Sequence, residues 1–103
     1  MNRYRIDFES MSWTAPMEGL RFKACKQGTR QLRLVEYTKD MEPHWCEKGH
    51  IGLILQGRFE IKFTDHTEVY NPGDGVFIPS GSEHKHMGIV LTDMVRAVFV
   101  EDV

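Results

Sequence analysis

Apolar and polar residues alternate with a period of two along much of the chain. Tyr4, Ile6 and Phe8 are separated by charged residues, and the same alternation returns at residues 20–24, 31–34 and 58–63. Successive side chains of a β-strand point to opposite faces, so each of these stretches predicts a strand. The apolar positions do not follow helical spacing.

Short, continuous apolar runs lie between these alternating stretches. They are rich in β-branched residues, are bounded by Gly, Pro, Asp or Ser, and occupy residues 51–55, 76–78 and 94–100. Their length and composition favour buried strands over helices. Sequences typical of tight turns stand at residues 56–57, 71–73 and 79–81. Many short strands joined by tight turns predict a β-sandwich or a β-barrel.

An all-β fold of two packed antiparallel sheets, a jelly-roll barrel, closes this pattern with few exposed strand edges. A five-stranded barrel and an immunoglobulin-like sandwich are the alternatives. The 103 residues suffice for one domain, and no linker-like stretch divides them, so we expect a single domain over residues 1–103. An additional edge strand within residues 1–13 would favour pairing with a second subunit, and a homodimer is therefore expected.

Composition narrows the range of partners. The formal net charge is −2 and no basic run is present, which argues against nucleic acid as a partner. The sequence lacks an apolar stretch long enough for a membrane-spanning helix and a signal-peptide pattern at residues 1–10, so a cytoplasmic protein without membrane contact is expected. In such a protein Cys25 and Cys46 should be free thiols or metal ligands, not a disulfide.

Metal-type donors are concentrated in two short segments. On an extended strand, His44 and Cys46 leave the same face, because they are two residues apart. His50 opens the next apolar strand after a turn and can return a third donor to the same place. His84 follows the turn at residues 79–81 and would supply a fourth donor from a distant part of the chain.

The spacing of these segments resembles the two sequence motifs of the cupin superfamily. The first motif is matched by His44, Cys46, His50 and Gly57, and the second by Gly73, Pro79, Gly81 and His84. The stretch from Glu42 to His50 is also similar to a subgroup of small cupins with a His-Trp-Cys motif. Two positions depart from the general pattern: Cys46 stands where a second His is usual, and His50 where a Glu is usual. The resemblance implies an antiparallel double-stranded β-helix.

The resemblance further implies a metal ion held in the barrel by His44, His50 and His84, with Cys46 as a further donor. Cys46 is either a fourth ligand or a small buried side chain. Imidazole and thiolate donors suit Zn²⁺, Ni²⁺, Fe²⁺ or Cu²⁺ better than Mg²⁺ or Ca²⁺. His86 is either a pocket residue behind the ligands or an exposed side chain.

Two functions are compatible with these residues. A site closed by four protein donors would make the protein a non-catalytic module that binds a transition metal or a small ligand. A site with an open position would support a metal-dependent enzyme, such as a dioxygenase, isomerase or decarboxylase, acting on a small molecule. A structural barrel with a vestigial site is disfavoured because four donors stand at the ligand positions. The sequence leaves enzymatic activity and the substrate open.

Overall fold

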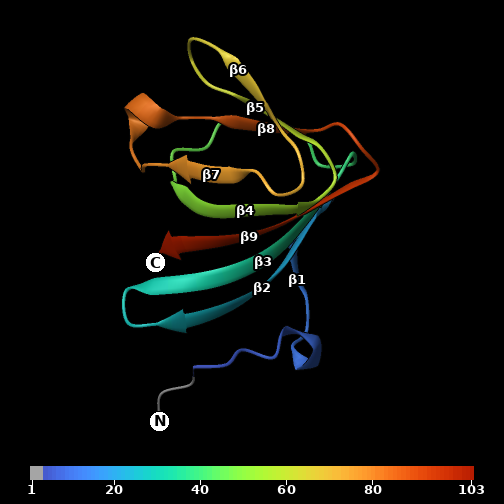
Figure 1. The fold of residues 1–103 in the computed structure, drawn as a ribbon, viewed down its shortest axis with the longest axis vertical. Coiled ribbons are helices and arrows are strands. Elements are labelled where there is room, and N and C mark those ends of the chain that lie inside the picture. The colour runs from blue at the N-terminus through green and yellow to red at the C-terminus, as the bar shows by residue number, and fades with distance from the viewer. Residues whose placement is uncertain (1–3) are drawn as a thin grey trace.

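Two antiparallel sheets form the protein in the computed structural model, which describes residues 4–103 (Figure 1). In chain order the strands are β1 (Thr14–Met17), β2 (Leu20–Gln27), β3 (Arg30–Thr38), β4 (His50–Gln56), β5 (Phe59–Lys62), β6 (Thr67–Tyr70), β7 (Gly75–Ile78), β8 (Met87–Val90) and β9 (Met94–Asp102). Short 3₁₀ turns at Phe8–Ser10 and Ser82–His84 are the helical elements of the described residues.

The larger sheet has the strand order β1-β2-β3-β9-β4-β7, and the smaller sheet has the order β6-β5-β8. The sheets face each other across an apolar core, whose most deeply buried members are Val35, Ile54, Val95, Ala97 and Phe99. Phe59 and Ile61 contribute to this core from β5. The arrangement confirms the predicted all-β jelly-roll barrel.

The inward face of the larger sheet changes from apolar to polar toward one end of the barrel. Val35 of β3 pairs with Ala97 of β9, and Ala97 in turn pairs with Ile54 of β4, in a row that is wholly apolar. Four residues further along, Gln31 of β3 pairs with Glu101 of β9, beside His50 of β4. The barrel therefore has an apolar end that forms the core and a polar end.

In β3 polar side chains face the barrel interior and apolar side chains face outward, the reverse of an ordinary half-buried strand. Gln31 and Arg33 face into the barrel, whereas Leu32 and Leu34 lie on its outward face, where they pair with Val100 and Val98 of β9. Ile51 and Leu53 of β4 and Phe77 of β7 extend this apolar outward face and are exposed. The period-two pattern predicted the strand correctly but not which face is buried.

The prediction of a strand at the N-terminus is wrong for the described residues. Residues 4–13 contain no strand, and residues 1–3 lie outside the part of the chain that the structure describes. Side chains of β2 hold this segment instead. Lys23 Nζ donates a hydrogen bond to the Phe8 carbonyl at 2.7 Å, and both Arg21 and Lys23 lie over the Trp13 ring. These contacts with cationic side chains hold residues 8–13 against β2, although the segment makes no backbone hydrogen bonds of a β-ladder.

The other predicted strands are confirmed with boundaries shifted by a few residues, and the three predicted turns connect strands as expected. Gly57, in the turn after β4, has a φ of +82°, and a Cβ at this position would lie 2.1 Å from the Met94 carbonyl oxygen. Only glycine tolerates both the backbone angle and the close approach.

Candidate metal and ligand site

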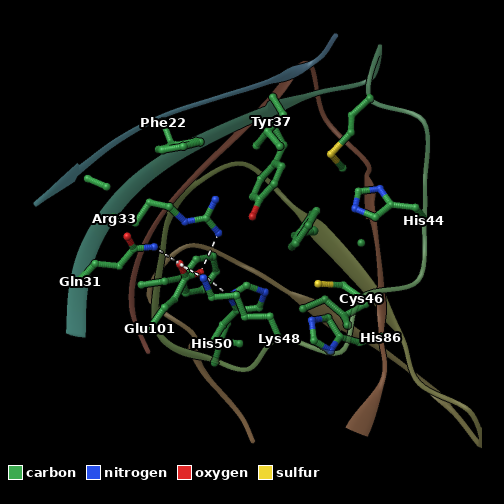
Figure 2. Close-up of a pocket in the computed structure, with 18 of the residues that line it drawn as sticks. Phe22, Gln31, Arg33, Tyr37, His44, Cys46, Lys48, His50, His86 and Glu101 are labelled. Carbon is green, nitrogen blue, oxygen red and sulfur yellow. Dashed lines mark hydrogen bonds and ion pairs between the residues drawn. The ribbon is translucent and has the colours of Figure 1, made fainter. Parts of the chain in front are cut away.

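The polar end of the barrel contains a cavity of about 590 Å³ (Figure 2). An apolar wall is formed by Leu20, Phe22, Met41, Phe59, Ile61 and Phe99. The polar lining consists of Lys26, Gln31, Arg33, Tyr37, His44, Cys46, Lys48, His50, His86 and Glu101. A cavity that combines an apolar wall with convergent polar groups has the general character of a small-molecule site.

Cys46 and His86 are brought together by an isolated pair of backbone hydrogen bonds. The Cys46 N–H donates to the His86 carbonyl at 2.8 Å, and the His86 N–H donates to the Cys46 carbonyl at 2.9 Å. This antiparallel bridge joins the loop before β4 to the segment before β8. It sets Cys46 beside His86, although the two residues are far apart in sequence.

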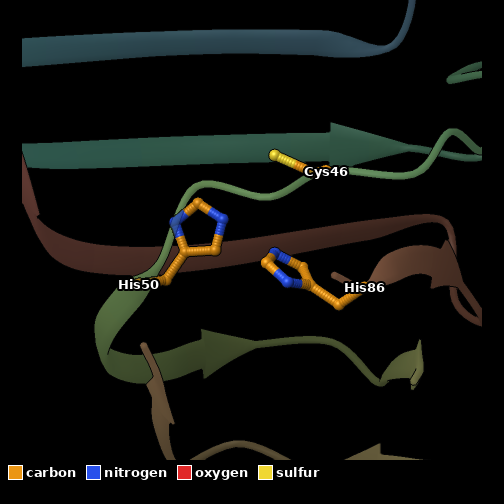
Figure 3. A group of neighbouring side chains, drawn as sticks. All are labelled: Cys46, His50 and His86. Carbon is orange, nitrogen blue, oxygen red and sulfur yellow. The ribbon is translucent and has the colours of Figure 1, made fainter. Parts of the chain in front are cut away.

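His50, at the start of β4, completes a cluster with these two residues (Figure 3). The Sγ of Cys46 and one ring nitrogen from each histidine all lie within 4.8 Å of one another. The two imidazole rings meet edge to face, with centroids 5.2 Å apart. His86 is buried, and Cys46 and His50 are partly buried at the cavity surface.

Hydrogen bonds orient both histidines in the same way. His50 Nδ1 donates to Glu101 Oε2 at 2.6 Å, and His86 Nδ1 donates to the His84 carbonyl at 3.0 Å. Both acceptors are oxygens without a hydrogen, so the proton must lie on Nδ1 in each ring. His86 Nε2 is then a lone-pair donor, and it is buried without a hydrogen-bond partner. A neutral His50 would likewise have its Nε2 lone pair free for a metal ion.

The Glu101 carboxylate is the common hydrogen-bond acceptor at the polar end of the barrel. Its Oε1 accepts from Gln31 Nε2 at 2.9 Å, and its Oε2 pairs with Arg33 Nη2 at 2.7 Å as well as with His50. Burial alone would raise the pKa of this carboxyl, but the hydrogen bond from His50 and the charge of Arg33 outweigh burial and lower the pKa to about 2. The carboxylate is therefore ionised and holds His50 in place.

The neighbouring histidines make Cys46 acidic. Hydrogen bonding from His50, and after it the adjacent His86 ring, lowers the pKa of the thiol to about 5, against the opposing effect of burial. The contact with His86 acts on the pKa although it falls outside ordinary hydrogen-bond geometry. Burial alone would lower the pKa of His50, but the bonds to Cys46 and Glu101 raise it. Cys46 is thus a thiolate near neutral pH, the form that binds metals or acts as a nucleophile.

The structure brings two of the four sequence-predicted ligands, Cys46 and His50, into this cluster. His44 lines the same cavity but lies outside the cluster, with its Nδ1 3.2 Å from the Glu42 carbonyl oxygen. His84 is not among the described residues that line the cavity. It ends a 3₁₀ turn, and its Nε2 lies 3.7 Å from Glu83 Oε1.

His86 stands where the sequence pattern led us to expect His84. Gly81, with a φ of 134°, and the 3₁₀ turn after it redirect the chain, so extended-strand geometry does not apply to His84. The clue was the spacing of two residues between the histidines, which left His86 as either a pocket or a surface residue. Glu101 carried no comparable signal, because it lies 51 residues from His50 in sequence.

The donor set fits a transition-metal ion. Two imidazole nitrogens and a thiolate are typical ligands of Zn²⁺ and related ions. Metal–ligand bonds of about 2.0–2.3 Å imply donor atoms roughly 3.3–3.8 Å apart around a tetrahedral ion. The donor atoms, within 4.8 Å of one another, would need to approach by at most about 1.5 Å. The unpartnered Nε2 of His86 is the group that such an ion would satisfy.

A small jelly-roll barrel with histidine and cysteine donors in its cavity is the class of protein that this fold and site define. Residues 33–100 match the Cupin_2 family, described as a cupin domain, and the chain belongs to this family. Among curated proteins, no relative matches the chain.

Solved structures with the same fold cover nearly all of the chain. KdgF from Halomonas sp. is 20% identical, with a TM-score of 0.78 over 99% of this chain and 94% of that one. The polyketide cyclase RemF from Streptomyces resistomycificus is 18% identical, with a TM-score of 0.78 over 98% of this chain and 80% of that one. A sugar phosphate isomerase of the cupin superfamily from Silicibacter pomeroyi is 14% identical, with a TM-score of 0.74 over 96% and 75% of the respective chains. Identities this low show a shared fold.

The described residues contain no helix that is both long and apolar enough to cross a membrane.

Proposed function

We propose that the protein binds a transition-metal ion in its barrel through Cys46 Sγ, His50 Nε2 and His86 Nε2. The observation that carries the proposal is the orientation of the histidines, since each directs Nδ1 to an oxygen and His86 keeps an unpartnered Nε2 inside the cluster. Metal-bound histidines almost always donate their other ring nitrogen to a carboxylate or a backbone carbonyl, and this chain offers one of each.

Each residue has a defined task in this site. Cys46 contributes a thiolate, which the hydrogen bond from His50 stabilises before a metal ion binds. Glu101 holds the Nδ1 proton of His50 and so directs Nε2 toward the cluster. A bound ion would supply Lewis acidity to a ligand in the cavity. Coordination through His50 would need its Nε2 without a proton, because a metal ligand must be deprotonated.

A metal-dependent enzyme acting on a small molecule is the second candidate function. The cavity of about 590 Å³ beside the cluster favours it, because three donors leave a coordination position free for a water molecule or a substrate. Two solved structures with the same fold, a polyketide cyclase and a sugar phosphate isomerase, support small-molecule chemistry in such a barrel. His44 is the lining residue that would instead close the fourth position.

Cobalt titration of metal-free protein tests the proposed ligands. We expect Cys46→Ser to abolish the sulfur-to-metal charge-transfer band, and His50→Ala or His86→Ala to weaken Co²⁺ binding by about 100-fold or more, because fewer donors remain to offset dehydration of the ion. His66→Ala is the matched control, since His66 is an exposed turn residue paired with Asp65 and Glu68. Unchanged affinity in both His50→Ala and His86→Ala would refute the proposal.

The sequence-derived ligands His44 and His84 stay predictions that the same titration tests. If His44 closes the site, His44→Ala weakens Co²⁺ binding about as much as His50→Ala, and azide leaves the Co²⁺ spectrum unchanged. If the position is open, His44→Ala has little effect and azide shifts the spectrum. His84→Ala should leave Co²⁺ affinity nearly unchanged when His86 is the ligand.

The expected homodimer and cytoplasmic location also stay predictions. The N-terminal strand that motivated the dimer is missing from the described residues. The apolar outward face of the larger sheet, with Phe77 75% exposed, is the surface whose burial would favour association.

A further inference from the structure

Basic side chains outnumber carboxylate side chains in the lining of the cavity. Lys26, Arg33 and Lys48 line it, whereas Glu101 is the one carboxylate side chain among the described residues that do so. Lys48 Nζ lies 4.0 Å from Glu101 Oε1 with its side chain 47% exposed, so it stands at the mouth. Glu101 and the Cys46 thiolate offset two of the three cations, and the basic side chains still outnumber these two anionic side chains.

Arg33 is the most enclosed of these cations. Its side chain is 13% exposed, its Nη2 pairs with Glu101 Oε2, and its guanidinium lies over the Phe22 ring at 5.4 Å from the centroid. A guanidinium has five N–H donors; Nε of Arg33 is itself buried, and the pairing with Glu101 goes through Nη2, which leaves terminal N–H groups for a ligand. The group is held rigidly in the wall and retains donor capacity.

Tyr37 adds a hydroxyl beside this guanidinium. Its ring stacks on Phe59, with centroids 5.0 Å apart and planes 14° from parallel, and its hydroxyl points into the cavity (Figure 2). Burial raises the pKa of this phenol to about 12, so it keeps its proton near neutral pH. Its oxygen interacts with Arg33, and its proton is left to donate to a ligand.

We propose that the cavity binds a small organic monocarboxylic acid, with the carboxylate held by Arg33 and Tyr37. The body of the acid lies against the apolar wall of Phe22, Phe59 and Phe99, and its far end faces Cys46, His50 and His86. The orientation of the far end toward Cys46, His50 and His86 rests on the proposed metal site, whereas the carboxylate subsite does not. Because Glu101 already offsets part of the charge of Arg33, the subsite matches the single negative charge of a carboxylate better than the double charge of a phosphate dianion.

Ligand-observed NMR and calorimetry on the metal-free protein test the subsite. The probes are benzoate and hexanoate, compared with the neutral isosteres benzamide and hexanamide. We expect the acids to bind about tenfold or more tightly than the amides, because a hydrogen bond to a charged group is stronger than one to a neutral group. Inorganic phosphate should displace neither acid. Equal binding of acids and amides, absence of acid binding, or displacement by phosphate would overturn the proposal.

Substitutions at Arg33 and Tyr37 test whether these two side chains hold the carboxylate of the bound acid. Arg33→Met should weaken benzoate binding by about 10- to 100-fold, and Tyr37→Phe, which keeps the stacked ring, should weaken it by about tenfold. Arg96→Met is the matched control, because Arg96 also pairs with a buried glutamate, Glu36, but does not line the cavity. If Arg33→Met does not fold, Tyr37→Phe decides. An unchanged affinity in Tyr37→Phe would contradict the assignment.

Failure of this proposal can be separated from failure of the metal site. Acid binding to metal-free protein together with no Co²⁺ binding supports the carboxylate subsite and removes the proposed function. Co²⁺ binding that needs Cys46 and His50, without discrimination between acid and amide, supports the metal site and removes the subsite.

Discussion

The two ends of the barrel interior are built from the same three strands and differ in polarity and in side-chain hydrogen bonding. At the core end, Val35, Ile54, Val95 and Ala97 are 0% exposed and carry no polar side-chain atom. At the cavity end, β3, β9 and β4 contribute Gln31, Glu101 and His50, joined by hydrogen bonds.

The difference shows how the polar residues are accommodated. Glu101 is 3% exposed, a burial that would be costly for an unpaired carboxylate, but Gln31, Arg33 and His50 all bond to it. The apolar residues of β3, β4 and β9 fix the register of these strands, and this fixed register places His50 beside Glu101. We therefore expect substitutions at the core end to change stability and those at the cavity end to change binding.

Ile54→Ala should give the largest effect and only on stability. Removal of a fully buried isoleucine side chain typically lowers the free energy of unfolding by about 2–5 kcal/mol, through lost burial and the cavity left behind. Chemical denaturation of metal-free protein measures it. The control is Leu55→Ala on the same strand, where the side chain is 47% exposed and a much smaller loss is expected. Folded Ile54→Ala protein should bind Co²⁺ as the unaltered protein does, and a large loss of affinity would break the proposed division.

Glu101→Gln should weaken Co²⁺ binding by about 10- to 100-fold, because the neutral amide orients and polarises His50 less well than the carboxylate. Glu36→Gln is a matched control, since Glu36 is a second buried glutamate, paired with Arg21 and Arg96 away from the cavity. It should lower stability and leave Co²⁺ affinity unchanged. Similar Co²⁺ affinities in the two variants would show that Glu101 is only structural.

Acid should destabilise the metal-free protein in a way that depends on Glu101. Its pKa is about 2 in the folded protein against a usual 4.5, so the unfolded chain binds the proton more readily. The stabilisation is present above about pH 4.5 and is lost as the pH falls toward 2. Denaturation midpoints measured across this range should fall less steeply in Glu101→Gln. Identical slopes would mean that the carboxylate is not held as the geometry indicates.

The alkylation rate of Cys46 tests whether the pKa of its thiol at the cavity end is lowered. Its pKa of about 5 predicts that iodoacetamide reacts with the metal-free protein at a nearly constant rate from pH 8 to pH 6, and more slowly below about pH 5. Mass spectrometry follows the modified peptide in a Cys25→Ser background. Metal binding should protect Cys46, whereas a rate that rises steadily to pH 8 would contradict the lowered pKa.

The smallest effect on the folded monomer should come from the outward face of the sheet. Phe77→Ser removes an exposed ring, so the stability of one chain should change little, while association should weaken if this face joins two copies. Sedimentation at micromolar concentration measures the mass of the unaltered protein and of the variant. A monomeric mass for the unaltered protein would disprove the expected homodimer.

The sequence alone predicted six of the nine strands and the three turns because their signals are local, whereas β1, β6 and β8 were not predicted. Period-two alternation, β-branched runs and turn residues determine backbone preference within a few residues. The same local spacing predicted that His44, Cys46 and His50 point together, and of these three the structure brings Cys46 and His50 into the cluster. The local pattern misled at residues 4–13, where contacts of Trp13 and Phe8 with Arg21 and Lys23 replace strand pairing.

The tertiary structure decided which residues share the site. The bridge between Cys46 and His86 joins distant segments, and Glu101 reaches His50 across 51 residues of sequence. Neither pairing has a local signal, because strand order and register follow from packing of the whole barrel. Packing also decided that Gln31 and Arg33 face inward while Leu32 and Leu34 face out. An alternating strand is compatible with either orientation, and only the partners on each side determine which face becomes the interior.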